Sequence, residues 1–344
     1  MTTNAATPLV GEATLQRLRQ PNGMTAVRYF LALSLIATHF CVLAGLPLAW
    51  WVDGDMVVKS FFVISGFFVL YSYLRTGDVK QYARRRFLRT YPLYFVVVAG
   101  STALGCLFST LPAGQYFTHP QTWRYLLCNA LFLNFAEPSL PGVFTANVMP
   151  EVNGSLWFMK VLVGFYILLP FIVWLLRRYG RVSVLAVLFL LSVGYTEWCR
   201  HLYATTGQRI FDLLHHQTPG YLPYFLAGMA ALLFFDRLRR HLGWWWVVAV
   251  GIELTARLAD FPLIIHLKPV TYAVVLFTAG WFVRPLRVLH RVPDITYGMY
   301  LIHVPVIQAL LQECRGTTPW LLLASATAIT ALLAYYGWLL TKTK

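Results

Sequence analysis

The sequence predicts an all-α polytopic membrane protein with about ten transmembrane helices and both termini in the cytoplasm. Three observations lead there. Of the 344 residues, 58% are hydrophobic and only 12% are charged, about half the charged share of an average soluble domain. Apolar runs long enough to cross a bilayer recur along the chain. Basic residues, 28 against 13 acidic ones, gather in alternate connections between these runs. Such a composition excludes a soluble enzyme and a disordered chain.

Ten stretches have the length and apolar character of membrane-spanning helices. A further stretch, 125–135, is apolar but too short to cross, and we expect an interfacial or re-entrant segment there. The chain would then comprise a cytoplasmic tail, 1–24, and one integral membrane domain, 25–344. The ten expected spans are 25–45, 57–74, 90–111, 155–176, 182–198, 219–235, 243–259, 267–283, 295–312 and 320–340.

Positive charge indicates the orientation of these spans. With the N-terminus inside, all but eight of the 28 Lys and Arg residues fall in cytoplasmic segments, as the positive-inside rule requires. This bias accounts for most of the net charge of +15 without a nucleic-acid partner. The eight exceptions are Lys59, Arg124, Lys160, Arg200, Arg209, Arg257, Lys268 and Arg315.

Neither the cysteines nor the paired histidines indicate a metal site. The five cysteines have no CxxC or paired spacing, and most lie in or beside apolar segments, so we interpret them as small buried side chains. His215 and His216 lie in an expected outer loop without further ligands at a zinc-binding spacing. We therefore expect no metal.

Two ionisable residues stand in the first expected span, where such groups are costly and usually functional. Arg28 and His39 are eleven residues apart, so they share one helix face at a separation of roughly 16 Å along the axis. Arg28 alone is also explained as an anchor whose side chain reaches the interface. His39 is interpreted either as a catalytic base or as a structural histidine.

Further candidates lie in the second expected span and in the basic loop that follows it. Ser65, with Gly66, makes a small notch among bulky side chains. Close helix packing explains it better than a nucleophile does, since no GxSxG elbow surrounds it. Arg86 and Arg89, in the basic run QYARRRFLRTYP, are three residues apart and face the same way on a helix. They would contact anionic lipid or clamp a phosphate group, which guanidinium forks suit well.

Polar residues also open the fourth span and occupy the ninth. Asn153, Trp157 and Lys160 would lie near the outer boundary, where Trp157 also fits the aromatic belt of a membrane protein. Tyr300 and His303 are three residues apart and therefore lie on one helix face.

Taken in order, these segments resemble membrane-bound acyltransferase family 3 over almost the whole chain. Arg28 and His39 match its R-x10-H signature, and VKSFFVISGFFVLYSYL is similar to its FF-x-x-SGF segment. RRRFLRTYPLY resembles RF-x-R-x-YPLY, NGSLWFMKV is similar to NGALWTLKV, and ITYGMYLIHVPVIQ is similar to SYGIYLIHFPVIQ. Two departures stand out. Leu162 replaces a glutamate of the family, and Thr341 and Thr343 stand where an acid and a proline are usual, which fits a divergent subgroup, another acceptor or lost activity.

The resemblance implies an acyl-CoA-dependent O-acyltransferase of the bacterial inner membrane. It would transfer an acyl group, most often acetyl, from cytoplasmic acyl-CoA to a hydroxyl of an exopolysaccharide or lipid-linked saccharide, without a tightly bound cofactor. A non-catalytic relative, acting as a transporter, flippase or assembly scaffold, is the alternative. The implied roles are His39 and Arg28 in catalysis, Arg86, Arg89 and Arg28 in binding acyl-CoA, and Ser65, Asn153, Trp157, Lys160, Tyr300 and His303 in binding the acceptor.

Overall fold

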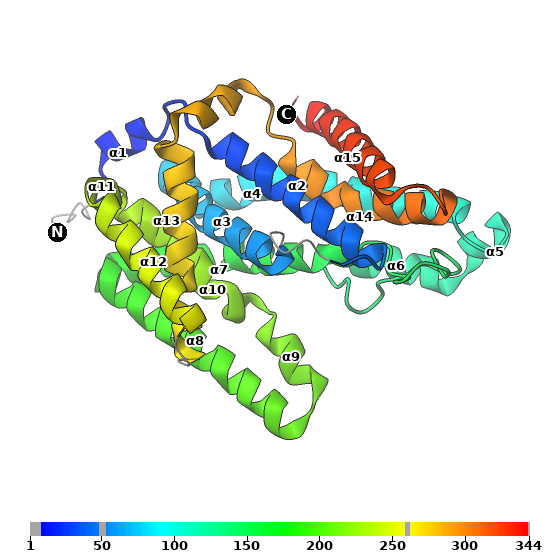
Figure 1. Ribbon diagram of the computed structural model, residues 1–344, viewed down its shortest axis with the longest axis horizontal. Coiled ribbons are helices and arrows are strands. Elements are labelled where there is room, and N and C mark those ends of the chain that lie inside the picture. Colours follow the sequence, from blue (N-terminus) through cyan, green and yellow to red (C-terminus); the bar gives the residue numbers. More distant parts are fainter. Residues whose placement is uncertain (1–7, 48–52, 259–261, 343–344) are drawn as a thin grey trace. The chain divides into compact units, whose positions relative to one another are not determined.

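The structure, a computed structural model, describes residues 8–47, 53–258 and 262–342 (Figure 1). These ranges are helical, with no β-strand and one antiparallel bridge, between Ser109 and Val143. The α-helices are α1 (Glu12–Arg17), α2 (Met24–Leu43), α3 (Gly54–Thr76), α4 (Val79–Leu104), α5 (Ala113–Thr118), α6 (Pro120–Ala130), α7 (Trp157–Tyr179), α8 (Arg181–Thr206), α9 (Arg209–His215), α10 (Thr218–Leu233), α11 (Phe235–Arg240), α12 (Leu242–Leu258), α13 (Lys268–Trp281), α14 (Thr296–Glu313) and α15 (Pro319–Lys342). Short 3-10 helices are η1 (Gly105–Leu107), η2 (Gly154–Leu156), η3 (Pro262–Leu267) and η4 (Arg284–Arg291).

Seven helices of the described chain are long and apolar enough to cross a membrane: α2, α3, α4 with η1, α7 with η2, α8, α13 with most of η3, and α15. The protein is therefore an integral, multi-pass membrane protein. The other three predicted spans fall on α10, α12 and α14, helices of 16, 17 and 18 residues that are not among the seven. The count of ten spans stays a prediction, as does the side of each terminus.

Some predicted features lie outside the described residues. These are positions 1–7 of the tail, the end of the predicted span 243–259, and Thr343 and Lys344. The short stretch 125–135 includes the end of α6 and the turns that follow it.

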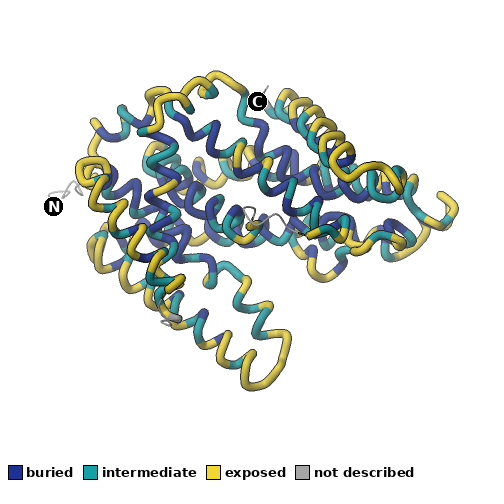
Figure 2. Tube along the Cα trace, viewed as in Figure 1, coloured by how far each residue is buried: buried dark blue, intermediate teal, exposed yellow. Residues whose placement is uncertain are grey.

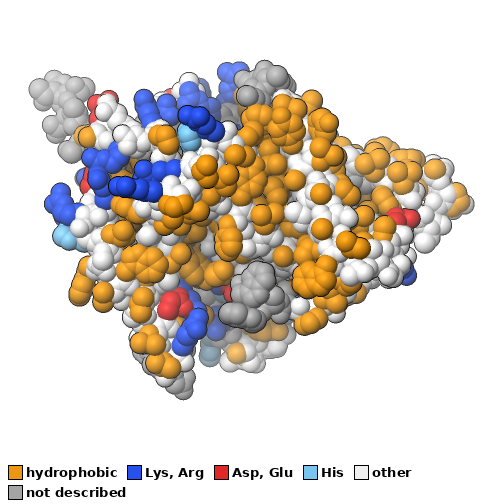
Figure 3. Space-filling model, turned by 45° about the horizontal axis from the view of Figure 1, so that its top comes forward, with side chains coloured by type: hydrophobic (Ala, Val, Ile, Leu, Met, Phe, Trp, Pro, Cys, Tyr) orange, Lys and Arg blue, Asp and Glu red, His pale blue; other side chains and the backbone are white. Residues whose placement is uncertain are grey.

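Large hydrophobic side chains cover much of the surface, as a protein surrounded by lipid requires. Phe30, Ile167 and Leu190 are each about two-thirds exposed or more, at 65%, 72% and 65%. Figure 3 shows hydrophobic side chains spread widely over the visible face. A soluble protein would not expose so much contiguous apolar surface.

The chain divides into two compact units, each assembled from three segments. The first unit consists of Met1–Val27, Lys59–Ala83 and Val161–Arg291, and the second of Arg28–Val58, Arg84–Lys160 and Val292–Lys344. The prediction of one membrane domain from residue 25 onward stays a prediction.

In the first unit, two glycines allow α3 and α10 to approach closely. A Cβ atom at Gly66 would lie 2.0 Å from the carbonyl oxygen of Phe225, and one at Gly228 would lie 1.9 Å from that of Val63. Small residues permit such contact between membrane helices because no side chain separates the backbones. The packing interpretation of the notch at Ser65 and Gly66 is therefore supported at Gly66.

In the second unit, the helix α14 is largely buried by its neighbours. Figure 2 shows much of its trace as buried. The helix α15 runs antiparallel to it, since Gly298 near the start of α14 meets Ala334 near the end of α15. Gly337 of α15 in turn packs against Leu93 of α4.

In three helices that contain a proline, a side chain replaces the backbone hydrogen bond that the proline removes. Proline has no amide hydrogen, so the carbonyl oxygen four residues earlier loses its helical donor, and a membrane protein must satisfy that oxygen internally. In each case a side chain from another segment donates to it. Asn153 donates to Leu301 before Pro305 at 2.9 Å, Tyr82 donates to Tyr166 before Pro170 at 3.2 Å, and Ser192 donates to Pro219 before Pro223.

Candidate active site

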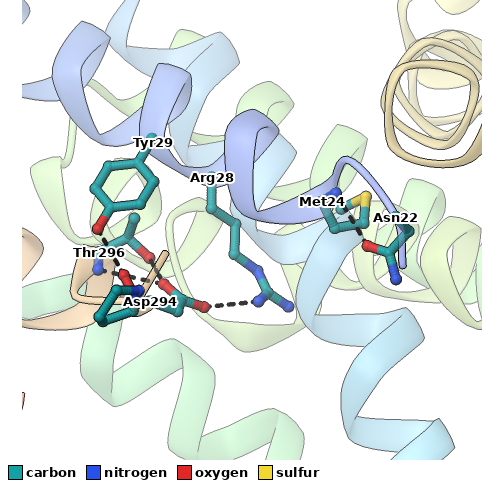
Figure 4. A network of polar contacts seen from close by, with 7 residues as sticks. Asn22, Met24, Arg28, Tyr29, Asp294 and Thr296 are labelled. Carbon is teal, nitrogen blue, oxygen red and sulfur yellow. Dashed lines mark hydrogen bonds and ion pairs between the residues drawn. The ribbon is translucent and has the colours of Figure 1, made fainter. Parts of the chain in front are cut away.

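An ion pair joins the beginning of α2 to the segment that precedes α14. The Arg28 guanidinium donates to the Asp294 carboxylate at 2.7 Å, and their side chains are only 18% and 28% exposed (Figure 4). The Thr296 hydroxyl donates to the other carboxylate oxygen at 2.6 Å. The Tyr29 hydroxyl donates to the carbonyl of Pro293 at 2.6 Å. These bonds fix the start of α14 against α2.

Asp294 is charged in this environment. Burial alone would raise the pKa of its carboxyl, but the Arg28 guanidinium, the hydrogen bonds from Thr296 and the charge of Arg89 together hold that pKa below its usual value. Arg89 of α4 is exposed and Arg86 is half-buried. The structure thus brings the charge of Arg89 near the Arg28–Asp294 pair.

Sequence reasoning missed Asp294. The signal was present, because an acid immediately before a predicted span stands out among connecting segments rich in Lys and Arg. Nothing in the sequence pattern alone connected this acid with Arg28, which lies 266 positions earlier.

A second polar contact lies further along the same two helices. His39 Nδ1 is 2.7 Å from His303 Nε2. The ring centroids are 4.9 Å apart and the ring planes are inclined by 27°. This centroid separation is accounted for by the short nitrogen–nitrogen distance plus the two ring radii, so the rings meet edge to edge. His303 is fully buried and His39 is half-buried.

The predicted shared face of Arg28 and His39 is confirmed. Arg28 contacts Asp294 just before α14, and His39 contacts His303 within α14. Both pairs follow the chain in the same order, so α2 and α14 run in the same direction. One face of α2 therefore carries both contacts.

The segment Asn153–Ser155 packs against α14 through its polar groups. Besides its bond to Leu301, the Asn153 side chain accepts from the Ser155 hydroxyl at 2.7 Å. The Tyr300 hydroxyl donates to the Ser155 carbonyl oxygen. Asn153, Ser155 and Tyr300 are all buried. Two of the predicted acceptor-binding residues thus have partners within the fold, and their role toward a substrate stays a prediction.

A family model for the acyltransferase domain matches residues 22–339, nearly the whole chain. The chain belongs to acyltransferase family 3. Nodulation protein 10 of Rhizobium leguminosarum bv. viciae is 26% identical over 299 residues, which cover 80% of this chain and 78% of that protein. The acetyltransferase-named ORF330 protein of Acidianus two-tailed virus is 25% identical over 325 residues, 90% of this chain and 88% of its own. Acyltransferase MdmB of Streptomyces mycarofaciens is 27% identical over 167 residues, 45% of this chain and 40% of that protein.

No solved structure matches this family 3 acyltransferase. Its family membership makes it an acyltransferase enzyme. The roles of individual residues are not given by that membership.

The remaining predicted residues of the acyltransferase lie on α3 and α7. Trp157 and Lys160 occupy the first turn of α7 and are half-buried. The Lys160 ammonium group is 4.6 Å from the centre of the Phe135 ring, a cation–π contact. Ser65 is half-buried on α3 and belongs to the first unit, as does the buried Leu162.

The pair His215 and His216 has a third potential ligand that the sequence analysis overlooked. Residues 209–215 form the short helix α9, which brings Asp212 within one turn of both histidines. The ligand atoms of the three residues lie within 4.8 Å of one another. Burial, followed by the charges of His216 and Arg200, lowers the pKa of His215. The expectation that no further ligand stands beside these histidines is therefore wrong.

Proposed function

We propose that the protein transfers an acyl group, most simply acetyl, from cytoplasmic acyl-CoA to a hydroxyl of a saccharide. An exopolysaccharide unit or a lipid-linked saccharide is the acceptor class we favour. One observation carries the proposal: an imidazole, His39, lies within the membrane helix α2 on the face that also holds Arg28. Acyl transfer itself follows from the family, and two relatives are named as an acetyltransferase and an acyltransferase.

The donor would enter from the side on which α2 begins. Coenzyme A carries several phosphates, and Arg28, Arg86 and Arg89 offer guanidinium groups on this side. Arg28 and His39 are separated by roughly 16 Å along α2, a distance comparable with the pantetheine arm. Because Asp294 already pairs with Arg28, Arg86 and Arg89 would make the main phosphate contacts, and Arg28 would add its positive charge.

The reaction needs a base but no covalent enzyme intermediate. His39 accepts the proton of the acceptor hydroxyl while its oxygen attacks the thioester carbonyl carbon. The new C–O bond forms, the C–S bond breaks, and the departing thiolate takes the proton back from His39. The products are the O-acyl saccharide and free coenzyme A, and the enzyme returns to its starting state.

The arrangement in the membrane is part of the proposal. Ten spans with both termini in the cytoplasm of a bacterial inner membrane are supported by the distribution of Lys and Arg. Helices at all ten predicted positions also support it. Trp157 and Lys160 would contact the saccharide, as would Asn153 and Tyr300.

The test follows radiolabel from acetyl-CoA in membranes that contain the full chain. We expect label in the saccharide fraction with the wild-type protein and none with His39→Ala. The exposed His290 supplies a matched control, since His290→Ala also removes one imidazole and should transfer label normally. Normal transfer by His39→Ala would overturn the base assignment. Wild-type membranes that leave saccharide unlabelled would favour a transporter or scaffold.

The phosphate contacts have their own matched pair of variants. Arg89→Gln should raise the KM for acetyl-CoA about tenfold, the equivalent of one charge-assisted hydrogen bond. Arg84→Gln removes the same charge from an exposed position of α4 that faces elsewhere. Equal KM values for the two variants would show that Arg89 acts only through its general charge.

A further inference from the structure

The backbone around His303 determines which ring donates and which accepts in its hydrogen bond with His39. His303 Nδ1 lies 2.7 Å from the carbonyl oxygen of Tyr300 and 3.1 Å from that of Met299. A carbonyl oxygen only accepts hydrogen bonds, so His303 Nδ1 must carry a hydrogen. These carbonyls belong to the backbone of α14 and cannot turn away.

The donor in the contact between His39 and His303 then follows if the buried His303 ring is neutral. His303 is fully buried, and its polar contacts in the described structure are His39 and two carbonyls, none of them an anion. An imidazolium in that position would be costly. A neutral ring with its hydrogen on Nδ1 has a lone pair on Nε2. His303 Nε2 therefore accepts, and His39 Nδ1 donates across the 2.7 Å contact.

We infer that His303 is a positioning residue that holds His39 in the tautomer whose Nε2 is the free base. This rests on the proposed function, in which His39 accepts the hydroxyl proton. Without a fixed acceptor at Nδ1, the neutral His39 ring could place its hydrogen on either nitrogen, and only one tautomer presents a lone pair at Nε2. His303 thus acts toward His39 as an orienting group acts toward a catalytic histidine in a triad.

The same contact stabilises the transition state. When the hydroxyl proton moves to His39 Nε2, His39 becomes a cation and its Nδ1–H donor grows stronger, because charge-assisted hydrogen bonds are stronger than neutral ones. The hydrogen between His39 and His303 stays on His39 Nδ1 throughout. The proton on Nε2 leaves with the thiolate. A bond that strengthens only as charge develops contributes to kcat rather than to KM.

Two substitutions at the same position separate this role from packing. His303→Leu fills the site without an acceptor, and His303→Gln offers an amide oxygen to His39 Nδ1. With acetyl-CoA as donor and native membranes as the source of acceptor, we expect His303→Leu to lower kcat about 100-fold and to leave the KM for acetyl-CoA unchanged. His303→Gln should recover at least about tenfold of that loss. Wild-type kcat in His303→Leu, or equal kcat in both variants, would overturn the inference.

A spectroscopic test needs no variant at position 303 and no acceptor. Nitrogen-15 NMR of the full, histidine-labelled chain in bilayers distinguishes a protonated ring nitrogen from one with a lone pair, and His39→Ala identifies the His39 signals by their loss. We expect hydrogen on Nδ1 and a lone pair on Nε2. Hydrogen on Nε2 would overturn the inference. Failure of the proposed function is a separate result, because it appears as undiminished label transfer by His39→Ala whatever tautomer is found.

Discussion

Two polar contacts join α2 to α14 and the residues just before it, and they differ in charge. Arg28 and Asp294 form an ion pair at the end where α2 begins. His39 and His303 form a neutral hydrogen bond further along the span, at the same distance of 2.7 Å. Near the end of the helix, Arg28 and Asp294 pair with each other, and the charge of Arg89 lies nearby. Deep in the span a charge is costly, so the contact there uses groups that can stay neutral.

This difference in charge suggests different roles: the ion pair holds the two segments together, and the histidine pair takes part in the proposed reaction. The Asp294 carboxylate is engaged by Arg28 and Thr296, and its charge is compensated. The histidine pair uses one nitrogen of His39, and in the proposed mechanism the other nitrogen receives the proton of the substrate. We therefore expect changes at the histidine pair to affect turnover, and changes at the ion pair to affect stability and donor binding.

The largest expected effect separates the two contacts kinetically. His39→Ala should lower kcat by about 10²–10⁴-fold, the range of a lost general base. Arg28→Gln should mainly raise the KM for acetyl-CoA. Initial rates of label transfer over a range of acetyl-CoA concentrations measure both. If Arg28→Gln lost as much kcat as His39→Ala, the distinction between anchor and base would be wrong.

The next effect is on stability. Asp294→Ala removes the carboxylate that pairs with the Arg28 guanidinium, whose side chain is only 18% exposed. Because the pair is partly buried, we expect a loss of about 1–3 kcal/mol, between the values for surface and buried pairs. Thermal unfolding in detergent micelles measures it. The exchanged pair Arg28→Asp with Asp294→Arg should recover part of this loss, and an exchanged pair no better than Asp294→Ala would show that the charges contribute little.

The ion pair also predicts a pH dependence. The pKa of Asp294 in the folded protein lies below its ordinary value of 3.8. A lowered folded pKa means that the carboxylate stabilises the fold above about pH 4 and that this stability is lost as pH falls through the lowered folded pKa. The unfolding temperature of the wild-type protein should therefore fall more steeply in acid than that of Asp294→Asn. Parallel curves for the two proteins would contradict this prediction.

The smallest expected effect concerns the hydrogen bond between Asn153 and Leu301, which involves neither the ion pair nor the histidine pair. Asn153→Ala removes the donor to the Leu301 carbonyl, which Pro305 leaves without a helical partner. We expect a loss of about 1 kcal/mol, typical of hydrogen bonds between membrane helices. In a Pro305→Ala background residue 305 regains its amide hydrogen, so Asn153→Ala should then cost less. Equal costs in the two backgrounds, measured by unfolding in micelles, would refute the proline explanation.

Much of the site was predictable where it depends on helix geometry within one segment. Periodicity correctly put Arg28 and His39 on one face of α2, and Gly66 stood out as a packing position. The partners of these residues could not be predicted in the same way. Asp294 was missed, and His303 was expected to contact the acceptor rather than His39. Asp212 was missed because no helix was expected around it.

The sequence by itself determined the membrane character, the helical class and the family of this protein. These follow from the length of apolar runs, the placement of basic residues and motifs that occur within single segments. Only the tertiary structure decided which groups meet: Arg28 with Asp294, His39 with His303, and Asn153 with Leu301. The physical reason is that a helical period gives the direction of a side chain from its own axis. Which helix packs on that face depends on the assembly of segments far apart in the chain.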